Sequence, residues 1–163
     1  MNVYFGASLF NEKDLTYNAS LADKIRKEIP NINLYLPQEN KSINDKSKSA
    51  NSIKIFEADT EKLEKADILF CNLDDDLGLA CEIGYFVSLA KKDKNKKIIA
   101  IFSDSRDGSL PHAKSKEELL SSSIAESQFC YINLYLIGAI KSYGKIFHSS
   151  SEAINYLKEL AIN

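Results

Sequence analysis

Short segments that are apolar at nearly every position alternate along this chain with longer segments of helical periodicity. The apolar segments are residues 2–6, 33–36, 66–73, 96–102 and 145–149. Helical spacing predicts helices over 12–29, 52–65, 79–92, from near Lys116 to Tyr143, and over 151–160. Continuously apolar strands are typical of parallel sheets that helices cover on both faces. The alternation therefore predicts an α/β fold with a five-stranded parallel sheet between two helical layers.

The size and composition of the chain suit one domain spanning 1–163. Its 163 residues are 44% hydrophobic and 27% charged, which is ordinary for a globular protein. There are no internal repeats, and the polar stretches 38–51 and 103–115 are expected to be loops. In such folds, ligands bind beyond the carboxyl ends of the strands. The loops that follow Phe5, Leu36, Leu73 and Phe102 are therefore the places to look for a site.

The charge and cysteine pattern narrows the range of partners and compartments. A formal charge of −2 offers no basic surface for nucleic acid or an anionic membrane, so a small-molecule ligand is expected. The cysteines Cys71, Cys81 and Cys130 lie in apolar stretches without CxxC spacing, which predicts reduced core residues of a cytoplasmic protein. With two histidines in the chain, a histidine metal cluster is not expected. No signal peptide or membrane-spanning run is evident.

Glu82 stands out because it interrupts an apolar helix. In DDDLGLACEIGYFVSLA (74–90) it lies three residues after Leu79 and four before Phe86, on or beside the apolar face. An unpartnered carboxylate in such a place costs several kcal/mol. Near a helix start, however, the helix dipole favours an ionised acid. Glu82 is therefore either a dipole or capping residue or a shielded nucleophile.

Two further acids share these features. Asp59 occupies the same apolar stripe as Phe56, Leu63 and Ala66 in its helix, where either a structural hydrogen bond or a role in a site would explain it. Asp76 is the member of the 74–76 acidic run that lies nearest the helix of Glu82. The contiguous acids do not fit a calcium loop, and solvated loop residues are the default for the other two.

These segments together resemble the nucleoside 2-deoxyribosyltransferases. The resemblance rests on YFGAS (4–8), LPQEN (36–40), Asp59 in its helix, DDDLGLACEIGY (74–85) and YINLYLIGAI (131–140), in the same order over nearly the whole chain. The DxGLxxExGY unit is fairly specific, and the other pieces are weak alone. The resemblance implies a flavodoxin-like fold and exchange of the base on a 2′-deoxyribonucleoside through a covalent deoxyribosyl-enzyme.

The resemblance also implies roles for individual residues. Glu82 falls on the nucleophile and Tyr4 on the tyrosine that holds its carboxylate, whereas Asp59 and Asp76 fall on acids that bind or protonate the base and position the sugar. Among the substrate-binding positions, the resemblance assigns the base-contacting glutamine to Gln38, and to Asn133 an asparagine that reaches the 5′-hydroxyl from a neighbouring subunit; Gly6 and Tyr135 complete this set.

The chemistry of glycosidic cleavage supports these assignments. A carboxylate beneath the anomeric carbon stabilises an oxocarbenium-like state and then bonds to it, while a second acid protonates the departing base. No metal and no organic cofactor is required. The nearly all-round apolar segment 130–140 together with Asn133 predicts a homo-oligomer, a dimer or a hexamer built from dimers.

Two departures and two alternatives accompany this interpretation. Some members have Met where this chain has Tyr135, and the insertion 103–118 lengthens the chain, so the base preference is open. One alternative is an N-glycosidase that releases the base of a 2′-deoxynucleoside or its 5′-monophosphate. The loop GASLFNEKD (6–14) has no arginine and two acids, which disfavours a phosphate. The other alternative is a non-catalytic nucleotide-binding module on the same fold.

Overall fold

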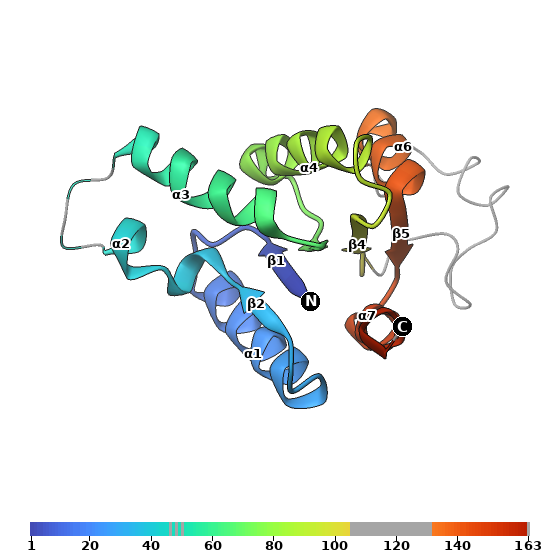
Figure 1. Cartoon of the computed structure of the whole chain (residues 1–163). Helices are drawn as coiled ribbons and strands as arrows, with labels where there is room; N and C mark the ends of the chain where they lie inside the picture. The colour runs from blue at the N-terminus through green and yellow to red at the C-terminus, as the bar shows by residue number, and fades with distance from the viewer. Residues whose placement is uncertain (46, 48, 50, 105–131, 163) are drawn as a thin grey trace, which may run out of the picture.

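The computed structural model describes residues 1–45, 47, 49, 51–104 and 132–162, and its elements alternate as the sequence predicts (Figure 1). The strands are β1 (Asn2–Gly6), β2 (Asn33–Tyr35), β3 (Ile68–Asn72), β4 (Lys97–Ile101) and β5 (Gly144–Phe147). The helices are α1 (Glu12–Glu28), η1 (Pro37–Glu39), α2 (Lys41–Asn44), α3 (Ser52–Lys65), α4 (Leu77–Ala90), α6 (Leu134–Tyr143) and α7 (Ser150–Ile162).

The strands form one parallel sheet in the order β2-β1-β3-β4-β5. This is the flavodoxin-like order, so the predicted fold class is confirmed. The chain leaves β1 toward β2 on one side and returns to β3 on the other. The loops after β1 and β3 therefore diverge at their carboxyl ends, and the crevice between them is where such sheets bind ligands.

The sheet separates two apolar layers. On one face, β1 and β3 residues such as Val3 and Phe70 pack with α1 and α7. On the other face, Tyr4, Leu69 and Ile98 pack against α3, α4 and α6. Figure 1 shows the same division, with α1 and α7 below the sheet and α3, α4 and α6 above it. Tyr4 and Tyr35 are register partners on adjacent parallel strands, so both project toward α3 and α4.

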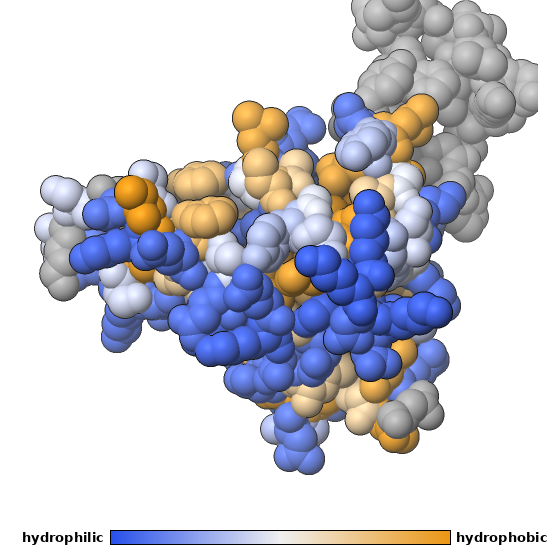
Figure 2. Space-filling model, turned by 45° about the horizontal axis from the view of Figure 1, so that its top comes forward, coloured by the Kyte–Doolittle hydropathy of each residue, from blue (hydrophilic) through white to orange (hydrophobic). Residues whose placement is uncertain are grey.

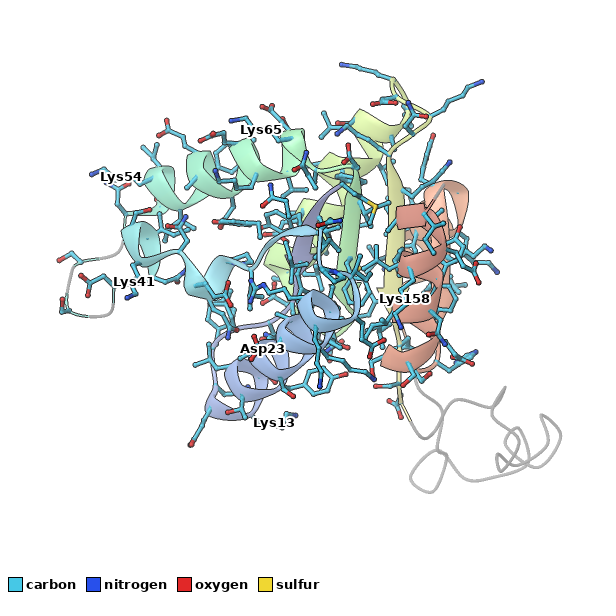
Figure 3. The ribbon with its side chains drawn as sticks, turned by 60° about the horizontal axis from the view of Figure 1, so that its bottom comes forward. Lys13, Asp23, Lys41, Lys54, Lys65 and Lys158 are labelled. Atoms are coloured by element: carbon cyan, nitrogen blue, oxygen red, sulfur yellow. The ribbon has the colours of Figure 1, made fainter. Side chains whose placement is uncertain are left out.

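Asparagine or aspartate side chains begin several of the helices. Asn11, Asn51 and Asp76 accept hydrogen bonds from backbone N–H groups in the first turns of α1, α3 and α4. Each of these caps satisfies a donor that has no partner within the helix. Charged side chains lie on the outside of the fold, as Lys54 and Lys65 of α3 illustrate (Figure 3).

The junction between α6 and β5 has no connecting loop. The helix ends at Tyr143 and the strand begins at Gly144, which pairs with Ile98 of β4. A Cβ atom placed on Gly144 would lie 1.8 Å from the carbonyl oxygen of Ile98. Because that oxygen belongs to the backbone of a central strand, the position requires glycine.

Several boundary predictions need correction. Of the helix predicted from Lys116 to Tyr143, the part up to residue 131 lies outside the described residues. Residues 132 and 133 are not helical, because Asn133 caps the start of α6 instead. The segment 38–51, predicted as a loop, contains the end of η1 and the whole of α2.

Two predicted core positions are also wrong. Cys71 is buried, but Cys81 is exposed because it lies on the side of α4 opposite the buried Leu79 and Ile83. Phe56 is 64% exposed, whereas Leu63 and Ala66 of the same predicted stripe are buried. Cys130 lies outside the described residues. Among the described helices, none has the length and apolar character needed to cross a membrane.

Candidate active site

Tyr4 and Glu82 form the centre of the site. The Tyr4 hydroxyl donates a 2.6 Å hydrogen bond to Glu82 Oε1, which joins β1 to the first turns of α4. Tyr4 is fully buried, and its ring lies 5.4 Å from that of Tyr35. This packing holds the phenol in one orientation, so the carboxylate of Glu82 has a fixed partner. It is the contact that the family resemblance implies for these two residues.

Burial raises the pKa of the Glu82 carboxyl to about 7. Desolvation is the largest cause, and the charges of Asp59 and Asp76 raise the pKa further, whereas the hydrogen bond from Tyr4 lowers it. At neutral pH the carboxylate and the acid are thus both well populated. A carboxylate with little solvent around it is a better nucleophile than a hydrated one, which suits Glu82 to covalent chemistry.

Gly6 leaves room for this carboxylate at the end of β1. A Cβ atom on Gly6 would lie 2.9 Å from Glu82 Oε2 and 2.8 Å from Leu79 Cδ1. Any side chain here would therefore displace the carboxylate or the leucine beside it. The contribution of Gly6 is the space that it leaves for the Glu82 carboxylate.

Asp59 is held by a tyrosine of the neighbouring strand. Tyr35 donates a 2.7 Å hydrogen bond to Asp59 Oδ1, and Asn40 Nδ2 donates to the Tyr35 oxygen at 2.9 Å. Burial raises the pKa of Asp59 above its ordinary value, and the Tyr35 bond opposes that rise. Asp59 is thus a partly buried carboxyl group that can hold a proton at a higher pH than an exposed aspartate does.

Asp76 caps a helix and also lines the cavity that contains Glu82. Its Oδ1 accepts a 2.7 Å hydrogen bond from the Leu79 N–H and so caps α4, the helix that carries Glu82. A Cβ atom on Gly78 would lie 2.9 Å from the same Oδ1, so the small residue keeps the cap accessible. The cap places Asp76 at the rim of the same crevice as Glu82.

A cavity of about 400 Å³ brings the three acids together at the carboxyl ends of the strands. This volume lies in the range of sites for small organic ligands. Apolar residues from the loop after β1, from η1 and from α3 form much of its wall. The lining residues are Ala7, Leu9, Phe10, Pro37, Ile43, Asn44, Asp45, Ile55, Asp59, Asp76, Gly78, Leu79 and Glu82.

Gln38 lies away from this cavity. Its Nε2 donates to the Leu15 carbonyl at 2.9 Å, and its Oε1 accepts from Asn18 at 3.3 Å. Asn18 in turn donates to the Ser8 carbonyl at 2.8 Å. The amide of Gln38 therefore ties η1 to α1 and to the loop after β1, and it is not among the residues that line the cavity.

Asn133 and Tyr135 are also outside the cavity of their own chain. Asn133 caps α6 by accepting from the Tyr135 N–H at 2.9 Å. Tyr135 is 89% exposed and the adjacent Leu134 is 84% exposed. Exposed apolar residues stand out among polar ones on the face that α3, α4 and α6 form (Figure 2).

Sequence reasoning missed Tyr35 and Asn40. Tyr35 lies at the end of the second strand, and Asn40 is the last residue of LPQEN. Their link to Asp59 depends on the pairing of β1 with β2. Charge and burial patterns in the sequence do not predict which residues of β1 and β2 pair. A polar residue directly after a strand end was the available clue, since strand ends converge on the ligand edge.

The chain matches the family model for nucleoside 2-deoxyribosyltransferase over residues 3–134. A conserved protein from Enterococcus faecalis V583 is 39% identical, with 97% of each chain covered and a TM-score of 0.82. A 2-deoxyribosyltransferase from Bacillus psychrosaccharolyticus is 19% identical, with 98% of this chain and 96% of that one covered and a TM-score of 0.62.

A 2-deoxyribosyltransferase from Leishmania mexicana is 16% identical, with 97% of each chain covered and a TM-score of 0.63. A comparison with curated protein sequences finds no significant match. At these identities the two transferase structures show a shared fold, whereas the family model covers most of the chain, including Tyr4, Asp59, Asp76 and Glu82. The chain is therefore a member of the nucleoside 2-deoxyribosyltransferase family.

Proposed function

We propose that this protein transfers 2-deoxyribose from one nucleobase to another in nucleoside salvage, through a covalent deoxyribosyl–Glu82 intermediate. The observation that carries the proposal is the Tyr4–Glu82 hydrogen bond in a cavity that Asp59 and Asp76 also line. A partly buried carboxylate held by a fixed donor serves as nucleophile, and a second carboxyl group of raised pKa is at hand to serve as acid.

In the first step, a Glu82 carboxylate oxygen bonds to C1′ of the donor nucleoside as the N-glycosidic bond breaks. The electron pair of that bond goes to the base nitrogen, and protonated Asp59 supplies the proton that neutralises the base. The hydrogen bond from Tyr4 weakens as Glu82 loses its negative charge. Asp76 holds the sugar at the start of α4.

In the second step, a nitrogen of the incoming base attacks C1′ and the ester bond to Glu82 breaks. The electron pair returns to the Glu82 carboxylate, and the proton lost by the incoming base returns to Asp59. Both residues are then in their starting states. No net oxidation occurs, so the residues of the site suffice for the reaction.

The charge of the cavity favours a nucleoside over a nucleotide. The described lining residues include Asp45, Asp59, Asp76 and Glu82 but no lysine, arginine or histidine. A 5′-phosphate would add negative charge beside these carboxylates, and the described part of the lining offers it no cationic side chain. This observation weighs against the monophosphate N-glycosidase alternative.

We further propose that each site is completed by a second copy of the chain. Asn133 does not reach the cavity of its own subunit, and Leu134 and Tyr135 beside it are almost fully exposed. An apolar exposed surface next to a polar side chain suits a contact between subunits. The family resemblance assigns to Asn133 the 5′-hydroxyl of a substrate bound in the neighbouring subunit.

The proposed function is tested by incubating the protein with thymidine and free adenine. We expect deoxyadenosine, together with a deoxyribosyl mass increase on the peptide that contains Glu82 when the reaction is quenched with acid. Release of thymine without deoxyadenosine would indicate hydrolysis, and consumption of neither thymidine nor deoxyadenosine as donor would favour a binding module. Glu82→Ala should lose more than about a thousandfold in rate, and retention of a tenth would remove Glu82 from the role of nucleophile.

A further inference from the structure

A chain of hydrogen bonds runs from the start of α2 to Asp59, and its direction follows from the groups that form it. The Ser42 N–H donates to Asn40 Oδ1 at 3.2 Å, and the Ser42 hydroxyl donates to the same oxygen at 2.7 Å. A backbone N–H can only donate, so the amide oxygen of Asn40 must face Ser42. Lys41, labelled in Figure 3, marks the start of α2 directly after Asn40.

The orientation of Asn40 determines the orientation of the Tyr35 hydroxyl. With its oxygen toward Ser42, Asn40 presents its N–H group to the Tyr35 oxygen at 2.9 Å. The single Tyr35 proton is thereby directed to Asp59 Oδ1 at 2.7 Å. Tyr35 does not line the catalytic cavity, although Asp59 does. The Tyr35 hydroxyl therefore reaches the cavity through Asp59, whereas the Tyr35 ring packs against Tyr4 and is kept in Tyr35→Phe.

We propose that Tyr35 and Asn40 are positioning residues that occupy Asp59 Oδ1 and reserve Asp59 Oδ2 for the proton exchanged with the base. Because Tyr35 donates to Oδ1, a proton on Asp59 resides on Oδ2, the oxygen that this chain of bonds leaves free for the cavity. The inference rests on the proposed function, since it concerns how the acid of that reaction is oriented.

Several charged or titratable groups surround Asp59. Tyr35 comes from β2, Tyr4 from β1 and Glu82 from α4, and Asp76 lies at the start of α4. Asp45 follows α2 and also lines the cavity, and Lys62 of α3 lies over the Tyr35 ring at 5.9 Å from its centre. Of these groups, Tyr35 is the one whose hydrogen bond to Asp59 lowers the carboxyl pKa.

The first test is direct titration of Asp59, which does not require activity. The carboxyl carbon of Asp59 is followed by NMR in protein labelled with ¹³C-aspartate and is assigned by its absence from Asp59→Asn. We expect Tyr35→Phe to raise the pKa of Asp59, because a bond that favours the carboxylate is lost. An unchanged pKa in a folded Tyr35→Phe protein would overturn the inference even if the enzyme transfers deoxyribose normally.

The second test compares two donor nucleosides, of which only one needs protonation of its departing base. Tyr35→Phe should slow deoxyadenosine cleavage about tenfold, because a misplaced acid protonates the base less well. It should leave 7-methyl-2′-deoxyguanosine unaffected, since that base departs without protonation. Equal slowing of both donors would show a merely structural role for Tyr35. If the wild-type protein cleaves neither donor, the proposed function fails instead.

Asn40→Asp tests the direction of the chain. Aspartate is as good a helix cap as asparagine, so it keeps the bonds from Ser42. It also presents an acceptor where Asn40 presents a donor, so the Tyr35 proton turns away from Asp59. We expect Asn40→Asp to slow deoxyadenosine cleavage in the wild-type background but not further in Tyr35→Phe. Additive losses would contradict transmission through the Tyr35 hydroxyl.

Tyr85→Phe is the matched control. The Tyr85 hydroxyl donates to Glu64 Oε1 at 2.6 Å and also joins α4 to α3, but neither residue lines the cavity. This variant removes a tyrosine–carboxylate bond of the same kind between helices that carry the site. It should change neither the Asp59 titration nor the ratio of the two donor rates.

Discussion

The carboxylate of Glu82 is costly to the folded protein because its pKa lies near 7, well above that of an exposed glutamate. The folded state therefore holds the Glu82 proton more tightly than the unfolded state does. Between about pH 4.5 and 7 the native state binds more protons, so this group lowers stability progressively as pH rises through that range. If Glu82 has the proposed role, its chemistry comes at the expense of stability at neutral and higher pH.

Glu82→Gln should accordingly stabilise the protein in a pH-dependent manner. At pH 8 we expect a gain on the order of 1–3 kcal/mol in the free energy of unfolding, because a neutral amide avoids the desolvation of a charge. At pH 4 the gain should nearly vanish, since Glu82 is protonated in both states. Urea denaturation at both pH values measures the difference. A gain of equal size at pH 4 and pH 8 would show that charge burial is not its source.

Tyr4→Phe should shift the pH profile of catalysis. The Tyr4 bond lowers the pKa of Glu82, so its loss raises that pKa, and a larger fraction of Glu82 is protonated at any pH near neutrality. We expect kcat/KM to fall about ten- to a hundredfold at pH 7 and less at pH 9, where the carboxylate is restored. A loss of the same size at every pH would argue that Tyr4 acts by position alone.

At the scale of elements, the junction of α6 and β5 sets the register of the sheet edge. Gly144→Ala forces a Cβ atom into the Ile98 carbonyl, and a backbone atom in a central strand cannot move aside as a flexible side chain would. We expect a loss of more than about 2 kcal/mol in the free energy of unfolding. Gly138→Ala in α6 is the control, because a Cβ there meets nothing within 4 Å and alanine favours the helix. Equal stabilities of the two variants would contradict this account.

Strand and helix types followed from periodicity, whereas several contacts did not. The parallel sheet was predictable because each strand is apolar at consecutive positions, and the position of Glu82 on α4 followed from its spacing to Leu79 and Phe86. The exposure of Phe56 could not be predicted, because it depends on which turns and faces of α3 other elements cover. The periodic pattern of a helix is the same whether or not a partner lies against it.

Some residues of the site could likewise be predicted from the sequence, whereas others could not. Asp59 was a candidate because it lies in the apolar stripe of its helix, and Asp76 because it follows a strand end at the start of the helix of Glu82. The role of Asn40 was not, since it depends on a strand register and on the short helix α2, which the polar composition of 38–51 concealed. The amide of Gln38, the residue chosen from the same segment, bonds to α1 instead of lining the cavity.

At the scale of the whole molecule, the proposed shared site can be tested by complementation. Glu82→Ala and Asn133→Ala, each inactive alone, are denatured together and refolded in equal amounts. Random pairing gives mixed dimers in about half of the population, each with one intact site of two, so about a quarter of wild-type activity should return. Because the two substitutions lie in separate elements, neither should disturb the other within one subunit.

The complementation experiment requires two controls. Asn133→Ala must be strongly impaired by itself. Glu82→Ala refolded with Tyr4→Phe should gain nothing beyond the two variants alone, because Tyr4 and Glu82 are hydrogen-bonded within one chain. If the Glu82→Ala and Asn133→Ala mixture shows no more activity than the separate variants, each subunit holds a complete site.

The absence of a loop between α6 and β5 has a mechanical consequence. A helix on a flexible linker can tilt or slide without moving its sheet, but α6 passes into β5 within one residue, and β5 is paired to β4 along its length. Force applied to the exposed surface around Leu134 and Tyr135 is thus transmitted to the sheet edge and is not absorbed in a hinge. The surface proposed to contact the neighbouring subunit is therefore coupled directly to the sheet through β5.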